Sequence, residues 1–210
     1  MNWKDFISVK RNRIELAITV VLLALILFSF TNFLNFVEER PGVDFTDPVL
    51  KHFDPVDLTW LTFALIYISL LTAVVSFSLK PEKLLFAFQL YSLMVCVRIA
   101  AMYLLPLEPP ATLIVLNDPF VELFGTGQTL TKDLFFSGHT ATLFILFLVE
   151  EKKILRSVFL ICTVVVAISV LIQHVHYTID VFAAVFFTYT CYVVLKKIKL
   201  YLNKSIIRHR

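Results

Sequence analysis

Long runs of apolar residues with almost no charge constrain this chain more than any other feature of its sequence. Hydrophobic residues make up 59% of its 210 residues, and a run of about twenty is long enough to cross a bilayer as a helix. We therefore predict an all-α, polytopic membrane protein in which residues 1–210 form a single membrane domain. The six transmembrane helices of this bundle are expected at residues 14–37, 58–79, 84–105, 134–149, 154–173 and 177–195.

Lysine and arginine residues are distributed unevenly between the two ends of the predicted bundle. One end carries 4, 2, 3 and 6 of them in the N-terminus, the turns at 80–83 and 150–156, and the tail at 196–210. The loops at the other end, 38–57 and 106–133, carry three: Arg40, Lys51 and Lys132. Because basic loops stay on the cytoplasmic side, we predict that both termini are cytoplasmic. The segment 196–210 is then a basic cytoplasmic tail.

Four ionisable residues lie at or near the ends of these apolar runs, where a charge is costly to keep. Such residues usually face a bundle interior or a watery cavity and serve a function. The topology derived from loop charges alone brings all four to the non-cytoplasmic end: Arg98, His139, His176 and Asp180. We therefore predict one active-site pocket that opens to the periplasmic or lumenal side.

The spacing of the titratable residues indicates the chemistry of this pocket. His176 and Asp180 are four residues apart, so on a helix their side chains share a face and the carboxylate orients the imidazole. An oriented imidazole is a better nucleophile or base. A second histidine, His139, titrates near neutral pH and is suited to protonate a leaving oxygen.

The neighbouring residues favour phosphoryl chemistry over acyl transfer. Arg98 offers a planar fork of donors to oxyanions, and the turn at Ser137 and Gly138 presents hydroxyl and backbone donors near a helix start. A histidine paired with a carboxylate carries a covalent phosphoryl group unaided. We therefore expect no metal ion and no cofactor.

Two motifs resemble those of a known group of membrane enzymes. SGH at 137–139 and H-x-x-x-D at 176–180 resemble the second and third motifs of the lipid phosphate phosphatase superfamily, the type 2 phosphatidic acid phosphatases. The longer segments KDLFFSGHT and HVHYTIDV are similar to the sphingomyelin synthase branch, and VCVRIAAMYLLPLEPP at 95–110 resembles the end of its third helix. The resemblance covers a catalytic core of about 90–195 and implies a six-helix bundle of the lipid phosphatase or phosphotransferase type.

The resemblance also implies a role for each matched residue. His176 attacks phosphorus, Asp180 supports it, and His139 assists the leaving alcohol. Asp133 and Ser137 join the substrate-binding residues. Two features depart from the branch: Lys132 stands where synthases have a glycine, and we expect no counterpart of the large N-terminal domain of animal synthases.

Two residue pairs that ordinary lipid phosphatases carry, and this chain lacks, favour transfer over hydrolysis. Ordinary lipid phosphatases carry an Arg-Pro pair and a Ser-Arg pair, whereas here Arg98 is followed by Ile99 and Ser169 by Val170. Fewer cationic ligands suit a phosphodiester, which bears less charge than a monoester. We predict transfer of a choline- or ethanolamine-type phospho-headgroup from a glycerophospholipid to a ceramide-like alcohol through a phosphohistidine, which releases diacylglycerol. The expected partners are these lipids and the membrane, without nucleic acid.

Other interpretations stay open at this stage. The chain could be a phosphatase that hydrolyses phosphatidate or isoprenyl pyrophosphate, or a non-catalytic lipid-binding membrane protein. His176 and Asp180 could cap loop backbone, and Arg98 could extend to the interface. His174 either contacts substrate or lines a turn, and the headgroup amine is expected near aromatic rings or acids such as Asp133 or Glu122.

Overall fold

The computed structural model describes residues 2–117 and 130–208, with side chains up to residue 202. It is an all-helical bundle in these regions, apart from one isolated bridge between Val43 and Leu107. The helices are α1 (Trp3–Ser8), α2 (Lys10–Glu39), η1 (Leu50–His52), α3 (Thr59–Ser78), α4 (Pro81–Leu104), α6 (Gly138–Val149), α7 (Lys153–Ile172) and α8 (Thr178–Arg208).

Five of these helices are long and apolar enough to cross a membrane: α2, α3, α4, α7 and α8. The polytopic class is thus confirmed, but the sixth expected span is shorter than predicted. Helix α6 has 12 residues, or about 18 Å at the usual rise per residue, against a hydrocarbon core of about 30 Å. Residues 134–137 form a loop instead, and α8 continues to Arg208 rather than ending at 195.

The ends of the helices follow local sequence signals. Pro81 opens α4, where its missing N–H is not needed. Asp57 accepts a hydrogen bond from the N–H of Thr59 at the start of α3 (2.9 Å). Ser137 is the N-cap of α6, because its Oγ accepts from the N–H of Thr140 at 3.4 Å. This cap explains why α6 begins at Gly138.

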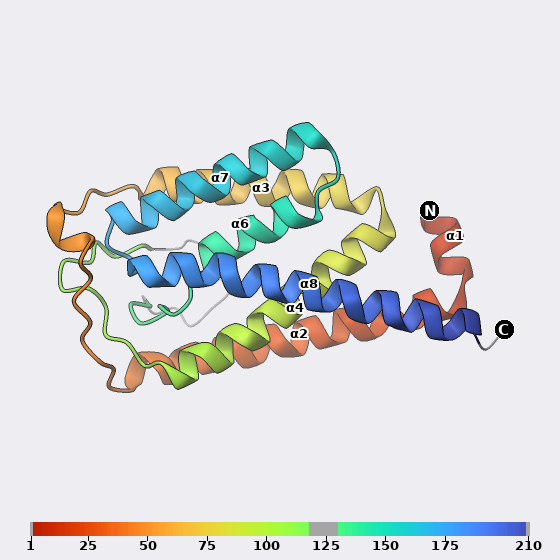
Figure 1. Ribbon diagram of the computed structural model, residues 1–210, viewed down its shortest axis with the longest axis horizontal. Coiled ribbons are helices and arrows are strands. Elements are labelled where there is room, and N and C mark those ends of the chain that lie inside the picture. The colour runs from red at the N-terminus through yellow and green to blue at the C-terminus, as the bar shows by residue number, and fades with distance from the viewer. Residues whose placement is uncertain (1, 118–129, 209–210) are drawn as a thin grey trace.

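Helix α6 occupies the middle of the bundle, where it contacts α3, α4, α7 and α8 (Figure 1). Helix α2 packs along α4 at the edge. Both termini lie toward one end, together with the short α3–α4 and α6–α7 turns, while the long connections gather at the other end. The basic turns and the loops poor in basic residues are therefore at opposite ends, as the charge pattern requires.

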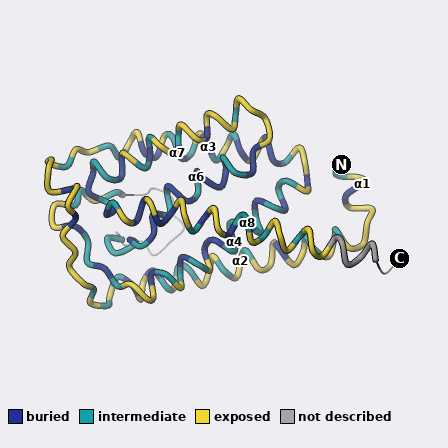
Figure 2. Tube along the Cα trace, viewed as in Figure 1, coloured by how far each residue is buried: buried dark blue, intermediate teal, exposed yellow. Residues whose placement is uncertain are grey.

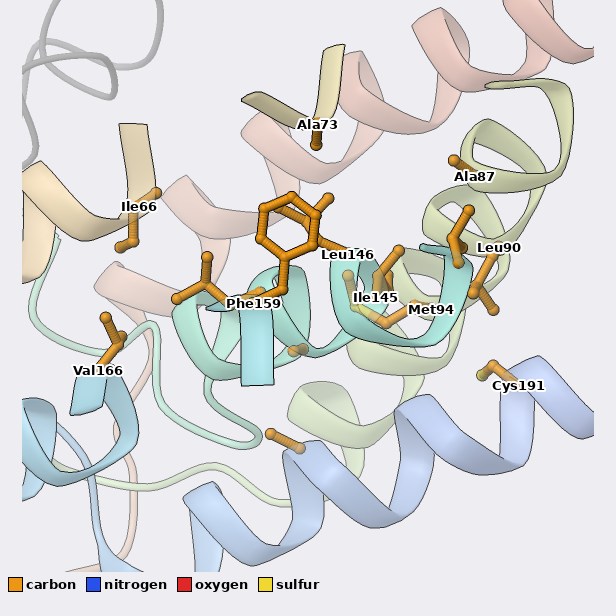
Figure 3. Close-up of a cluster of buried hydrophobic side chains, with 14 of the residues drawn as sticks. Ile66, Ala73, Ala87, Leu90, Met94, Ile145, Leu146, Phe159, Val166 and Cys191 are labelled. Atoms are coloured by element: carbon orange, nitrogen blue, oxygen red, sulfur yellow. The ribbon is translucent and has the colours of Figure 1, made fainter. Parts of the chain in front are cut away.

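The hydrophobic core surrounds α6 (Figure 3). Leu146 of α6 lies among Met94 of α4, Phe159 and Val166 of α7, and Cys191 of α8, and all of them are buried. Exposed residues lie along the outward faces of the helices (Figure 2), and many of them are large and apolar, as expected where lipid replaces water. Because α6 is enclosed by protein, it has little lipid to match in length.

A buried carboxylate fastens the end of the bundle that holds the short turns. Glu150 follows α6 and accepts hydrogen bonds from Ser76 Oγ of α3 (2.7 Å), Lys83 Nζ of α4, and the N–H of Lys152 (2.9 Å). Burial alone raises its pKa, but these donors outweigh that effect and lower the pKa of Glu150 to about 2. The carboxylate thus stays charged and ties four helices together at this end.

Candidate active site

A cavity of about 540 Å³ lies between α2, α3, α4, α6 and the loops. Most of its wall is apolar, with side chains such as Phe30, Ile66, Leu70 and Met94. The predicted residues Arg98, Asp133, His139 and His176 also line it, together with Gly138. The cavity thus combines a polar cluster with the apolar lining that suits a lipid.

The two histidines and the aspartate of the predicted triad come together. The ring centroids of His139 and His176 are 6.3 Å apart, which is close enough for one phosphoryl group and its leaving oxygen to bridge the two rings. Asp180 places Oδ2 3.4 Å from Nδ1 of His176. This separation is long for a strong hydrogen bond, as catalytic contacts often are before substrate binds.

The backbone at the start of α8 explains how this contact forms. The sequence pattern placed His176 on the last helix, but α8 begins at Thr178, so His176 precedes it. Asp180 accepts at Oδ2 from the N–H of Tyr177 (3.0 Å), as an acid at the third helical position does in a capping box. Asp180 therefore also caps backbone at the start of α8, which was the other interpretation of this residue from the sequence. Its Oδ1 is buried and has no hydrogen-bond partner among the described residues.

The turn that carries His176 is held by a residue the motifs did not single out. Gln173 is fully buried and donates through Nε2 to Thr59 Oγ1 at 2.8 Å. Its Oε1 accepts from the N–H of Leu58 (3.2 Å). These bonds fasten the end of α7 to the start of α3. A lone glutamine inside an apolar run was the only sequence signal for this role.

Arg98 is buried inside the bundle, with 3% of its surface exposed, and does not extend to the interface. Its Nε donates to the carbonyl oxygen of Phe136 at 2.6 Å, and Nη2 lies 2.8 Å from Asp133 Oδ1. The guanidinium also faces the ring of Phe30, with Cζ 5.3 Å from the centroid. Arg98 and Asp133 therefore form one ion pair on the cavity wall.

Gly138 permits the close approach of α6 to this arginine. A Cβ atom at this position would lie 2.9 Å from both Cζ and Nη1 of Arg98, which is closer than carbon atoms pack. The first turn of α6 therefore rests directly on the guanidinium. The helix N-terminus and the cation then face the same cavity, and both favour an anion there.

Two further predicted substrate ligands lie outside the cavity lining. Ser137 is fully buried: it caps α6, and its N–H donates to the carbonyl oxygen of Asp180 at 3.2 Å. His174 packs its ring against Phe53 (5.1 Å between centroids), and its Nδ1 lies 2.5 Å from Thr112 Oγ1. Burial lowers the pKa of His174 despite the nearby Asp47 and Asp54, which keeps its ring neutral at pH 7. Glu122 lies outside the described residues.

Lys132, the departure from the synthase pattern, is not among the residues that line the cavity. Its Nζ donates to Glu108 Oε1 and to the carbonyl oxygen of Arg40, both at 2.9 Å. Glu38, at the end of α2, accepts from the N–H groups of Thr131 (3.0 Å) and Lys132 (2.9 Å). These bonds anchor the segment that leads to Asp133. Two acids and a lysine that lie far apart in sequence, at the end of α2 and in the connection between α4 and α6, give no sequence signal of such a network.

The chemistry that this cluster can support is phosphoryl transfer in which one imidazole acts as the nucleophile and the other moves a proton. Within the described ranges, no group of three His, Cys, Asp or Glu side chains is placed to hold a metal ion. Arg98 and the start of α6 supply the positive potential that an oxyanion needs.

The comparison with known families agrees with this arrangement. Residues 132–198 match the PAP2 superfamily C-terminal family. The matched segment contains the whole triad, together with α6, α7 and most of α8. It supports the type 2 phosphatidic acid phosphatase superfamily and, in general terms, a lipid enzyme of the phosphatase or phosphotransferase type. No curated protein and no solved structure matches the chain.

Proposed function

We propose that this chain is a membrane phosphotransferase that moves a choline- or ethanolamine-type phospho-headgroup from a glycerophospholipid to a ceramide-like alcohol. The observation that carries the proposal is the meeting of His139 and His176 at the wall of an apolar cavity, with Asp180 in contact with His176. The match to the PAP2 superfamily C-terminal family supports the same class of chemistry.

The first half of the proposed reaction transfers the headgroup phosphate to the enzyme. Asp180 holds the proton on Nδ1 of His176, which leaves the lone pair of Nε2 to attack phosphorus. The bond between phosphorus and the glyceride oxygen breaks as the N–P bond forms. Protonated His139 gives its proton to that oxygen, and diacylglycerol leaves.

The second half reverses these steps with a new alcohol. Neutral His139 takes the proton from the primary hydroxyl of the acceptor, and the oxygen attacks the phosphohistidine. The N–P bond breaks, and His176 and His139 return to their starting protonation states. Arg98 and the N-terminus of α6 stabilise the charge on the phosphoryl oxygens throughout.

The charge of the pocket favours a diester over a monoester. Asp133 already offsets the charge of Arg98, and Lys132 is engaged by Glu108. The remaining positive potential matches the single charge of a phosphodiester better than the double charge of a phosphomonoester. We extend the proposal to sidedness: the histidines lie at the end remote from the basic turns, so they face the periplasm or the lumen.

The test uses purified protein in liposomes with ceramide and phospholipids labelled in the headgroup phosphate. Donors with choline, ethanolamine, inositol or glycerol headgroups are compared. We expect a labelled sphingolipid and an equal amount of diacylglycerol, with a loss of at least about a hundredfold in His139→Ala and His176→Ala. His52→Ala, at an exposed position in η1, serves as the matched control and retains activity.

Other outcomes of this test support one of the two alternative functions. Release of inorganic phosphate from phosphatidate or isoprenyl pyrophosphate without an acceptor identifies a hydrolase, which the family match also fits. No reaction with any of these lipids contradicts catalysis and leaves a lipid-binding protein.

A further inference from the structure

Asp47 reaches the start of α8 from the loop between α2 and α3. It is 131 positions from Thr178 in sequence, and 5% of its surface is exposed. Its Oδ2 accepts from the backbone N–H of Thr178 at 2.6 Å, and its Oδ1 accepts from the Thr178 hydroxyl at 3.1 Å. The same Oδ1 accepts from the N–H groups of Val49 and Leu50. One carboxylate thus joins its own turn to the segment between His176 and Asp180.

These hydrogen bonds replace a cap that the local sequence cannot supply. The first N–H groups of a helix need acceptors, and the tyrosine that precedes Thr178 is not among the usual N-cap residues. Asp180 satisfies the N–H of Tyr177, and Asp47 satisfies the next one. Although burial raises the pKa of Asp47, the donors from Thr178 and Val49 outweigh it and hold that pKa below its ordinary value. The carboxylate is therefore charged at a helix N-terminus.

The rest of the loop closes on the same turn. The ring of Phe45 meets that of Tyr177 edge to face, with centroids 5.3 Å apart. Leu50 and Tyr177 belong to one buried apolar cluster, and the Tyr177 hydroxyl donates to the carbonyl oxygen of Glu108 at 2.8 Å. The turn is thus held by side chains on both sides, but the bonds from Asp47 act on the backbone immediately after His176 and Tyr177.

We propose that Asp47 is a positioning residue that fixes the His176–Asp180 pair by clamping the first turn of α8 from another loop. Asp47 is not among the residues that line the cavity, so it acts through Thr178. The 3.4 Å contact between the histidine and Asp180 depends on the backbone between them. A rotation there separates the two groups, and misplacement of this kind costs up to about a hundredfold in rate. The inference rests on the proposed function, because that function makes His176 the nucleophile.

The first test compares Asp47→Ala, Asp47→Asn and Thr178→Val with Asp54→Ala, an exposed acid of the same loop. Each folded, monodisperse variant is assayed for diacylglycerol release well below its unfolding temperature. We expect kcat of Asp47→Ala to fall about ten- to a hundredfold with KM within twofold. Asp47→Asn and Thr178→Val, which each keep part of the network, fall between Asp47→Ala and wild type. Asp54→Ala matches wild type. A kcat within twofold of wild type in Asp47→Ala, or in Asp47→Asn where the alanine variant does not fold, overturns the inference.

A second measurement needs no substrate and separates this inference from the proposed function. The rate at which diethyl pyrocarbonate modifies His176 is followed by mass spectrometry. Loss of the clamp moves Asp180 away from Nδ1 and makes the imidazole less nucleophilic, so we expect at least a threefold slower reaction in Asp47→Asn than in Asp54→Ala. An equal or faster reaction contradicts the inference. If wild type turns over no lipid at all, the proposed function fails while this measurement still decides the role of Asp47.

Discussion

At the scale of single residues, the pocket depends on close contacts around Arg98 that leave no space for a larger side chain at Gly138. Arg98 is held by Phe136 and Asp133 and is covered by the first turn of α6 at Gly138. A guanidinium fixed on three sides presents its donors to a phosphate without first losing side-chain freedom. The geometry of the proposed oxyanion site therefore depends on a glycine, the residue without a side chain.

Gly138→Ala is expected to weaken donor binding without unfolding the protein. The added methyl group displaces the guanidinium of Arg98, so KM for the donor phospholipid rises about tenfold, as expected from loss of a charge-assisted hydrogen bond. Helix propensity favours alanine over glycine by up to about 1 kcal/mol, so thermal stability changes little. Kinetics in a double-mutant cycle with Arg98→Ala check the cause. A full effect of the methyl group in the Arg98→Ala background contradicts this explanation.

At the scale of elements, each end of the bundle is fastened by buried polar side chains rather than by apolar packing alone. Gln173 joins α7 to α3 at the end with the histidines. Glu150 joins α3, α4, α6 and α7 at the other end. Because lipid offers no hydrogen bonds, these groups are satisfied only when the helices assemble correctly. They favour one arrangement of helices whose outer faces are largely apolar.

The carboxylate of Glu150 is expected to make stability depend on pH in acid. Its folded-state pKa of about 2 lies below the ordinary value of 4.5. Its contribution is therefore fully present above about pH 4.5 and disappears as the pH falls toward 2. Glu150→Gln should unfold roughly 5 °C lower than wild type at pH 7, because buried donors lose their charged acceptor. As the pH falls from about 4.5 toward 2, the stability of this variant should decrease less than that of wild type. Thermal unfolding in detergent measures both effects.

Glu151→Gln provides the matched control for this prediction. Glu151 is the next residue, and its ion pair with Lys80 is exposed, where such pairs contribute little. We expect an unfolding temperature within about 1 °C of wild type. If the two variants are equally destabilised, the buried network at Glu150 is not the cause.

At the scale of the whole molecule, α6 and α8 begin, beside His139 and His176, toward the end opposite the short basic turns, which makes sidedness testable with one pair of probes. The native residues Cys96, Cys162 and Cys191 are first replaced by alanine. We expect a membrane-impermeant maleimide to label Asp54→Cys in intact cells. Lys80→Cys, at the α3–α4 turn, should react only after permeabilisation. The reverse pattern places the active site in the cytoplasm.

Features that depend on neighbouring residues could be predicted from the sequence, whereas contacts between residues far apart in the sequence could not. The apolar runs predicted five spanning helices correctly, because each run is a local property. The sixth was overestimated, since Ser137 starts α6 late and the surrounding helices remove the need to match the bilayer. His176 and Asp180 meet as their spacing predicted, although a turn rather than a helical face brings them together. The roles of Asp47 and Glu150 had no local signal, and the role of Gln173 had only the weak signal of a lone glutamine in an apolar run.

The sequence by itself determined the membrane class, the approximate spans and the candidate reactive side chains, because transfer into lipid and short-range geometry depend on neighbouring residues alone. Only the tertiary structure decided that Arg98 rests on Phe136 and Gly138, and that a loop acid clamps Thr178 across 131 positions. Such pairings follow from how helices of similar apolar character pack together. In a bilayer that packing is selected by shape and by the few buried polar groups that must find partners.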